Sequence, residues 1–127
     1  MQKQSGKKIV AVLEDLFFTV KISDAAKRNG FDVAFVKAEQ DALAAARADK
    51  PSLIILDLNC HGVNPLKLVG KLKGDSELKH ISVIAYLSHI QGELKQKAHE
   101  AGCDMVLARS AFSQNLPQIL KRHSGIA

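Results

Sequence analysis

Short apolar runs alternate with longer amphipathic segments along the whole chain. The runs are rich in Val and Ile and are bounded by charged residues, Gly, Pro or Asn, which is typical of strands buried on both faces of a parallel sheet. The clearest of them, Leu53-Ile54-Ile55-Leu56, ends abruptly in Asp57. The pattern predicts five strands, at residues 9–13, 31–36, 53–57, 81–87 and 105–108.

The segments between the runs have the spacing of amphipathic helices. Phe18 and Ile22 begin an apolar stripe that ends before Gly30, a residue suited to a left-handed helix cap. Asn64 followed by Pro65 has the pattern of an N-cap and a first helical residue. Because proline is tolerated in the opening turn of a helix, Pro117 is expected there. Helices are predicted at residues 16–28, 39–49, 65–73, 92–101 and 115–123.

Strictly alternating strands and helices determine the predicted architecture. Consecutive βα units form a parallel sheet with crossover helices on both faces. We therefore expect an α/β fold, a doubly wound five-stranded parallel sheet, in one domain over residues 8–123. Residues 1–7 and 124–127 are expected to be flexible ends.

Composition narrows the class of protein. The 127 residues are 46% hydrophobic and 24% charged, as in a soluble globular protein, and no stretch resembles a membrane span or the apolar core of a signal peptide. A cytoplasmic location is expected, with Cys60 and Cys103 as reduced thiols. The net charge of +5 is interpreted mainly as solvated helix faces, with a docking surface for an acidic partner as the alternative.

Polar side chains gather where the predicted strands end. The carboxyl edge of such a sheet is where ligands bind. Carboxylates beside a guanidinium suit a hard cation such as Mg²⁺, a phosphoryl group, or both. The residues expected at this edge are Glu14, Asp15, Asp57, Asn59, Leu87, Ser88, His89, Arg109 and Ser110.

Simpler interpretations exist for several of these residues. A carboxylate at a strand end also serves as a helix N-cap, so Asp57 alone does not establish a site. Ser88-His89 has the residue types of a nucleophile and a base, but neighbours in sequence rarely face each other. Cys60-His61 lacks the paired ligand spacing of a zinc site.

Three stretches resemble the receiver domains of two-component response regulators. They are the acid pair after the first strand, Leu56-Asp57-Leu58-Asn59, and Gly102-Cys103-Asp104-Met105-Val106-Leu107-Ala108-Arg109, and the likeness runs from about Lys8 to His123. It implies a CheY-like (flavodoxin-like) fold with strand order 2-1-3-4-5 and a signalling module rather than an enzyme. It also implies that Asp57 accepts a phosphoryl group, and that Glu14, Asp15, Asp57 and the Asn59 carbonyl bind Mg²⁺.

The chain departs from the receiver pattern at several positions. Leu87 stands where a hydroxyl normally receives the phosphoryl oxygen, with Ser88 one position later as a shifted hydroxyl. Arg109 occupies the lysine position, and its planar fork is not equivalent to an ammonium group. Val106 replaces the usual switch aromatic. By strict spacing, the acid pair also aligns with Leu13-Glu14.

These departures indicate a divergent receiver or pseudo-receiver. We hypothesise that Asp57 is a metal-binding or structural acid, or is weakly phosphorylated, while signalling depends on surface docking. The implied partner is a histidine kinase or another signalling protein, and neither a membrane nor nucleic acid is expected to be one. The docking face is expected on strand 4, helix 4 and strand 5, with Tyr86, His89, Lys95, Lys97 and Val106. A flavodoxin-like cofactor binder or a small enzyme is the alternative on the same fold.

Overall fold

Five strands alternate with five helices in the computed structural model, which describes residues 7–88 and 92–123. The strands are β1 (Lys7–Val12), β2 (Phe31–Val36), β3 (Leu53–Asp57), β4 (Ser82–Leu87) and β5 (Met105–Ala108). The helices are α1 (Leu16–Arg28), α2 (Glu39–Asp49), α3 (Pro65–Gly74), α4 (Gly92–Ala101) and α5 (Arg109–Arg122). The predicted flexible ends lie outside the described residues, except for Lys7, which is the first residue of β1.

The strands form one parallel sheet in the order β2-β1-β3-β4-β5. This confirms the predicted fold class and strand order. The strands are not added in one direction across the sheet, because β2 pairs with one side of β1 and β3 pairs with the other side. The carboxyl ends of β1 and β3 are therefore neighbours, and a crevice for ligands is expected beyond them.

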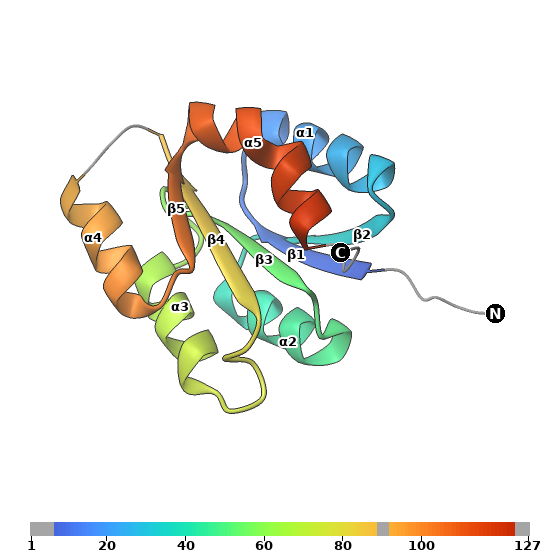
Figure 1. Cartoon of the computed structure of the whole chain (residues 1–127). Helices are drawn as coiled ribbons and strands as arrows, with labels where there is room; N and C mark the ends of the chain where they lie inside the picture. Colours follow the sequence, from blue (N-terminus) through green and yellow to red (C-terminus); the bar gives the residue numbers. More distant parts are fainter. Residues whose placement is uncertain (1–6, 89–91, 124–127) are drawn as a thin grey trace.

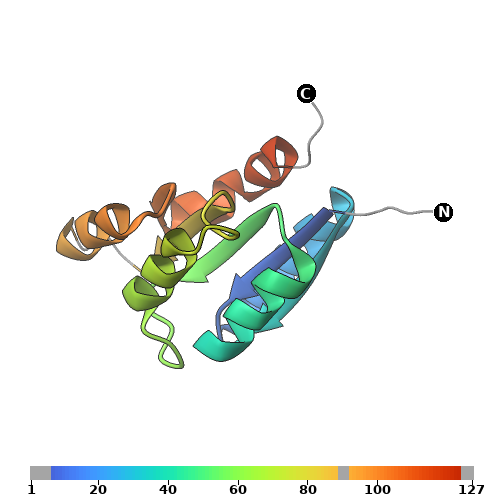
Figure 2. The ribbon, with the colours of Figure 1, turned by 90° about the horizontal axis from the view of Figure 1, so that it is seen from below.

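Helices cover both faces of the sheet, and each face has its own core (Figures 1 and 2). On one face α1 and α5 bury Phe18, Ile22, Phe112 and Leu116 against β1, β3 and β4. On the other face α2, α3 and α4 bury small or aliphatic residues, including Ala46 and Leu68. Within each strand, successive residues enter opposite cores, as strand pleating requires.

The predicted helix boundaries are confirmed where a capping residue marks them. The Asn64 side chain accepts a hydrogen bond from Lys67 N at 3.2 Å, and Pro65 is the first residue of α3. Gly30 has a φ of +74°, the left-handed conformation expected after α1. Cys60 and Cys103, the two cysteines of the chain, are both free and buried.

The predicted start of the last helix is wrong. α5 begins at Arg109, and Pro117 lies in its interior instead of its opening turn. Proline removes one backbone hydrogen bond and costs about 3 kcal/mol in a helix interior. The helix nevertheless continues because it buries four large side chains at helical spacing. These side chains are Phe112, Leu116, Ile119 and Leu120.

The expected surface cluster around β4 and β5 also needs correction. Tyr86 is completely buried and Val106 is 3% exposed, because both side chains enter the cores of the sheet. Lys95 and Lys97 are exposed on α4 as expected. His89 lies outside the described residues. Of the expected docking residues that the structure describes, only the two lysines are at the surface.

Candidate functional site

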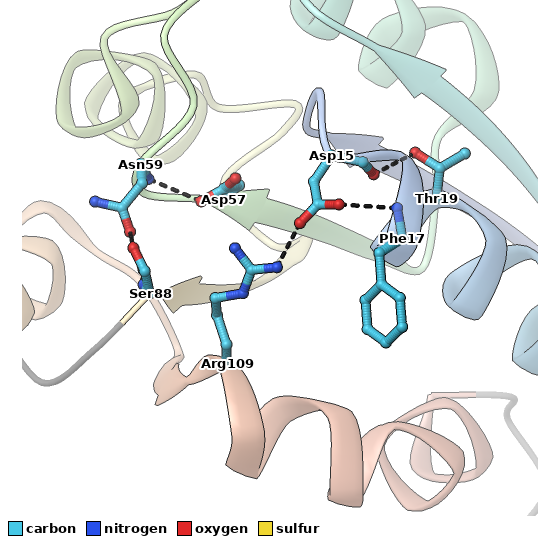
Figure 3. A network of polar contacts seen from close by, with 7 residues as sticks. All are labelled: Asp15, Phe17, Thr19, Asp57, Asn59, Ser88 and Arg109. Carbon is cyan, nitrogen blue, oxygen red and sulfur yellow. Dashed lines mark hydrogen bonds and ion pairs between the residues drawn. The ribbon is translucent and has the colours of Figure 1, made fainter.

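The site lies at the carboxyl edge of the sheet, at the ends of four strands. Asp57 is the last residue of β3, and Asp15 follows the end of β1 by three residues. Ser88 directly follows β4, and Arg109 directly follows β5. In Figure 3 Asp57 lies between two pairs of polar side chains, Asn59 with Ser88 and Asp15 with Arg109. The fold thus brings together residues that are far apart in the sequence.

Asp57 is the one buried charged residue among those that the structure describes, with 7% of its surface exposed. Its Oδ1 accepts a hydrogen bond from Asn59 N at 2.8 Å. Burial raises the pKa of the Asp57 carboxyl, while the Asn59 amide and then the Arg109 charge lower it. The negative charges of Asp15 and Glu14 also raise this pKa. Asp57 is therefore a desolvated acid surrounded by both signs of charge.

Asp15 has two structural partners. Its Oδ1 accepts a hydrogen bond from Phe17 N at 2.8 Å, which caps the N-terminus of α1. Its Oδ2 forms an ion pair with Arg109 Nη2 (Figure 3). The Arg109 guanidinium also lies over the Phe18 ring, with Cζ 4.7 Å from the ring centroid. Both carboxylate oxygens of Asp15 are thus occupied by residues of this chain.

Glu14 is oriented differently from Asp15. Its Oε1 accepts a hydrogen bond from His61 N at 3.1 Å and contacts Cys60 Sγ at 3.7 Å. Glu14 therefore supports the loop between β3 and α3. Leu13, which strict spacing places in the acid pair, is 1% exposed and belongs to the core. One exposed carboxylate, Glu14, thus faces the loop that follows Asp57.

The close approach of two backbone segments explains why residue 62, which lies near Glu14, is a glycine. A Cβ atom at Gly62 would lie 2.3 Å from the Lys37 backbone oxygen and 3.8 Å from Glu14 Oε2. A backbone atom cannot move aside as a flexible side chain can. A residue without a side chain is therefore required where the β3–α3 loop passes the end of β2.

Ser88 contacts the site through Asn59. Both its backbone N and its Oγ donate to Asn59 Oδ1, each at 2.7 Å (Figure 3). The Ser88 hydroxyl is therefore connected to Asp57 through Asn59, which is hydrogen-bonded to both residues. Leu87, at the position where a hydroxyl was expected, is 1% exposed and lies in the core between the sheet and the helices α2, α3 and α4.

Sequence reasoning missed an aromatic cluster beneath Arg109. Tyr86 stacks on Phe112 with ring centroids 4.8 Å apart, and Phe18 contacts both rings. The three residues come from β4, α5 and α1, so no local pattern indicates that they meet. The cap formed by Asp15 was also missed, although an aspartate before an apolar helical stripe is a recognised signal for it.

The donors suit a metal only in part. No group of three or more His, Cys, Asp or Glu side chains that could hold a metal ion occurs within residues 7–88 and 92–123. Mg²⁺ does not require such a cage, because it is commonly bound by one or two carboxylates and water. Asp57, Glu14 and a backbone carbonyl are donors of the required chemistry, whereas Asp15 is occupied by Phe17 and Arg109.

The sequence profile of the response regulator receiver domain matches residues 9–121. The chain belongs to the response regulator receiver family. Its relatives include the polar-differentiation response regulator DivK of Brucella ovis, which is 26% identical over 121 residues. That alignment covers 94% of this chain and 98% of DivK.

Solved structures of response regulators have the same fold. The phosphorylated cyanobacterial phytochrome response regulator RcpA has a TM-score of 0.79 at 25% identity, covering 93% of this chain and 91% of RcpA. The chemotaxis response regulator CheY4 of Vibrio cholerae has a TM-score of 0.81 at 21% identity, covering 94% and 99%. The Mn²⁺-bound form of response regulator Rcp1 has a TM-score of 0.74 at 18% identity, covering 91% and 90%.

This receiver domain is therefore a module of two-component signalling. Receiver domains interact with histidine kinases and other signalling proteins, and they are in general not enzymes. The relatives give no support to the flavodoxin-like alternative. Within the described residues, no helix has the length and apolarity needed to cross a membrane.

Proposed function

We propose that this receiver domain accepts a phosphoryl group on Asp57, from a phosphorylated histidine kinase or a small acyl phosphate. The supporting observation is the position of Asp57. It is a nearly buried carboxylate at the carboxyl edge of the sheet, within electrostatic reach of Arg109. Desolvation of an attacking carboxylate and a fixed positive charge nearby both favour phosphoryl transfer.

The proposed reaction replaces one bond to phosphorus with another. One oxygen of the Asp57 carboxylate attacks the phosphorus atom and forms an acyl phosphate. The bond from phosphorus to the histidine nitrogen, or to the oxygen of the acyl donor, breaks, and the leaving group keeps the electron pair. Because Oδ1 of Asp57 already accepts the Asn59 amide, Oδ2 is the better candidate for the attacking atom.

We assign the proposed Mg²⁺ site to Glu14, Asp57 and the Asn59 carbonyl. When bound, the ion would neutralise charge on the transferring phosphoryl group. The Mn²⁺-bound form of Rcp1 shows that a protein of this fold binds a divalent cation. For Asp15 we propose a different task, the positioning of Arg109, because its two oxygens are already occupied.

Arg109 and Ser88 are the proposed ligands of the phosphoryl oxygens. Arg109 supplies two N–H groups in a planar fork, which suits phosphate oxygens. Ser88 reaches the site through Asn59, so its hydroxyl would have to leave Asn59 Oδ1 to contact a phosphoryl oxygen. The buried Leu87 and Val106 cannot make such a contact. We therefore propose that Arg109 is the main phosphoryl ligand and Ser88 a secondary one.

For partner docking we propose the outward face of α4. Lys95 and Lys97 are exposed there, and Lys97 is paired with the exposed Glu93 at 3.1 Å. This face would attract an acidic surface of a signalling protein. Replacing both lysines with Glu should abolish binding to the cognate histidine kinase, while Lys27→Glu on the exposed side of α1 should not.

Intact-mass measurement after incubation with acetyl phosphate and Mg²⁺ tests the acceptor function. The wild-type protein should gain the mass of one phosphoryl group, and Asp57→Asn should gain none. Asp41→Asn, which changes an exposed acid on α2, is the matched control and should behave as the wild type. No gain in the wild type, or an equal gain in Asp57→Asn, would contradict the proposal.

A further inference from the structure

The Arg109 side chain extends toward both Asp15 and Asp57, and it is paired with Asp15 (Figure 3). Among the described residues its ion pair is with Asp15, and no ion pair with Asp57 occurs there. Its positive charge nevertheless acts on Asp57. The Arg109 side chain is 35% exposed and that of Asp15 is 24% exposed. The guanidinium is thus close enough to respond to new negative charge on Asp57 and is not locked in the core.

Asp15 connects this pair to the beginning of α1. Its carboxylate accepts Phe17 N, and its backbone oxygen accepts Thr19 N at 3.0 Å and Thr19 Oγ1 at 2.9 Å. The two residues next in the chain, Leu16 and Phe17, are 78% and 63% exposed. A change at the Asp15 carboxylate therefore acts directly on a turn that carries two exposed apolar side chains.

The usual positions for transmitting a phosphorylation signal are occupied by apolar residues. Leu87 is 1% exposed and Val106 is 3% exposed, and both are packed in the core beneath α3 and α4. Neither side chain has a polar group that could donate a hydrogen bond to a phosphoryl oxygen. Arg109 and Asp15 are on the opposite face, together with α1 and α5.

We propose, on the basis of the acceptor function proposed above, that Asp15 and Arg109 form an ion-pair switch that reports the state of Asp57 at the N-terminal turn of α1. The phosphoryl group carries about −1.5 to −2 charges in place of the −1 of the free Asp57 carboxylate, and so attracts Arg109 more strongly than the −1 of Asp15 does. It also offers oxygens in the geometry that a guanidinium binds with two parallel hydrogen bonds. Arg109 moves to the phosphoryl oxygens, Asp15 loses its ion pair, and the turn with Leu16 and Phe17 rearranges.

A single tryptophan can report this rearrangement, because the chain contains no natural one. Phe17→Trp places it on an exposed side chain of the turn. Beryllium fluoride with Mg²⁺ serves as the phosphoryl probe, and ¹⁹F NMR measures its binding independently of the tryptophan fluorescence. The fluorescence of the Phe17→Trp protein should change with the same saturation curve as the ¹⁹F signal of the bound probe.

Asp15→Asn in the Phe17→Trp background tests the switch itself. Asparagine keeps the N-cap but cannot form the ion pair, so the fluorescence without probe should already be near the value of the loaded protein. The probe should also bind about fivefold or more tightly, because it no longer competes with Asp15 for Arg109. Asp24→Asn, which removes an exposed acid of the same helix, is the control and should change neither property.

A double-mutant cycle with Arg109→Gln separates competition from simple charge removal. If Asp15 acts through Arg109, the gain in affinity from Asp15→Asn should disappear in the Arg109→Gln background. An equal gain in both backgrounds, or an unchanged fluorescence response in Asp15→Asn, would overturn the switch and leave the acceptor function standing. Absence of probe binding by the Phe17→Trp protein would overturn both.

Discussion

Asp57 and Tyr86 are in register across the paired strands β3 and β4, and both are almost completely buried. Side chains at such positions extend to the same face of a sheet. The Tyr86 ring is stacked on Phe112, and its hydroxyl has no hydrogen-bond partner within the described part of the chain. A carboxylate and a hydroxyl are therefore both desolvated at this edge, and each has a cost in stability.

Tyr86→Phe is predicted to stabilise the domain. The substitution keeps the stacking on Phe112 and removes a buried hydroxyl that has lost its hydrogen bonds to water. The free energy of unfolding should rise by about 1 kcal/mol, measured by urea denaturation. A loss of stability would mean that the hydroxyl has a favourable contact in the native protein.

Tyr86 is also predicted to resist ionisation as long as the domain is folded. Burial, followed by the charges of Asp57 and Asp15, raises the pKa of Tyr86 above its ordinary value of 10.0. Below that value the hydroxyl is neutral in both states and has no pH-dependent effect. At higher pH the unfolded state ionises first, so stability falls. Tyrosinate absorbance should therefore appear only together with the loss of the circular dichroism signal of the fold.

Asp57→Asn is predicted to stabilise the metal-free protein at neutral pH. Because burial raises the Asp57 pKa in the folded state, the unfolded chain releases the proton first as pH rises above the ordinary value of 3.8. Stability falls through that window and stays low above the folded pKa. In EDTA at pH 7 the variant should gain about 1 kcal/mol, which is a few degrees in Tm, and near pH 3 the difference should vanish.

Asp75→Asn is the opposite case and should destabilise at neutral pH. Hydrogen bonds from Glu77 N and from Arg47 lower the pKa of Asp75. Because the Asp75 pKa is lower in the folded state, the ionised carboxylate stabilises the fold at pH values above the pKa of the unfolded chain. This stability is lost as the pH falls through the pKa of the folded state. Thermal unfolding at pH 7 and pH 3 of both variants would show the two signs. If both variants change stability in the same direction at pH 7, the pKa shift assigned to one of the two carboxyls is wrong.

Gly102→Ala is predicted to destabilise the domain by about 2 kcal/mol. Gly102 follows α4 with a φ of +123°, and an added Cβ would lie 2.6 Å from Cγ of Lys73. Lys73 cannot move freely, because its Nζ donates to Ile81 O at 2.8 Å and to Asp104 Oδ2 at 3.0 Å.

Gly70→Ala is the matched control for Gly102→Ala. Gly70 lies inside α3, and an added Cβ would meet nothing within 4 Å. Alanine is the better helix former, so this variant should gain about 0.5–1 kcal/mol. Chemical denaturation of both proteins measures the two effects, and a similar loss in each would argue against the positive φ as the cause.

Local patterns of sequence were sufficient for most of the fold. The apolar run 53–56 predicted a buried strand, and Asn64-Pro65 and Gly30 predicted helix ends, because propensity and capping act over a few neighbouring residues. Pro117 misled because a local penalty was weighed without the four core side chains that α5 buries. Tyr86 and Val106 were wrongly expected at the surface. Their positions within β4 and β5 do not show that helices cover both faces of these strands and bury the two side chains.

The sequence by itself determined the α/β fold, the parallel sheet, the receiver family and the position of Asp57 at a strand end. Only the tertiary structure decided how the charges around Asp57 are paired. Asp15 meets Arg109 across 94 residues, while its neighbour Glu14 turns to the loop of His61. Adjacent carboxylates are equivalent in a sequence pattern. Their partners depend on side-chain direction and on which strand ends lie together, and these exist only after the sheet has formed.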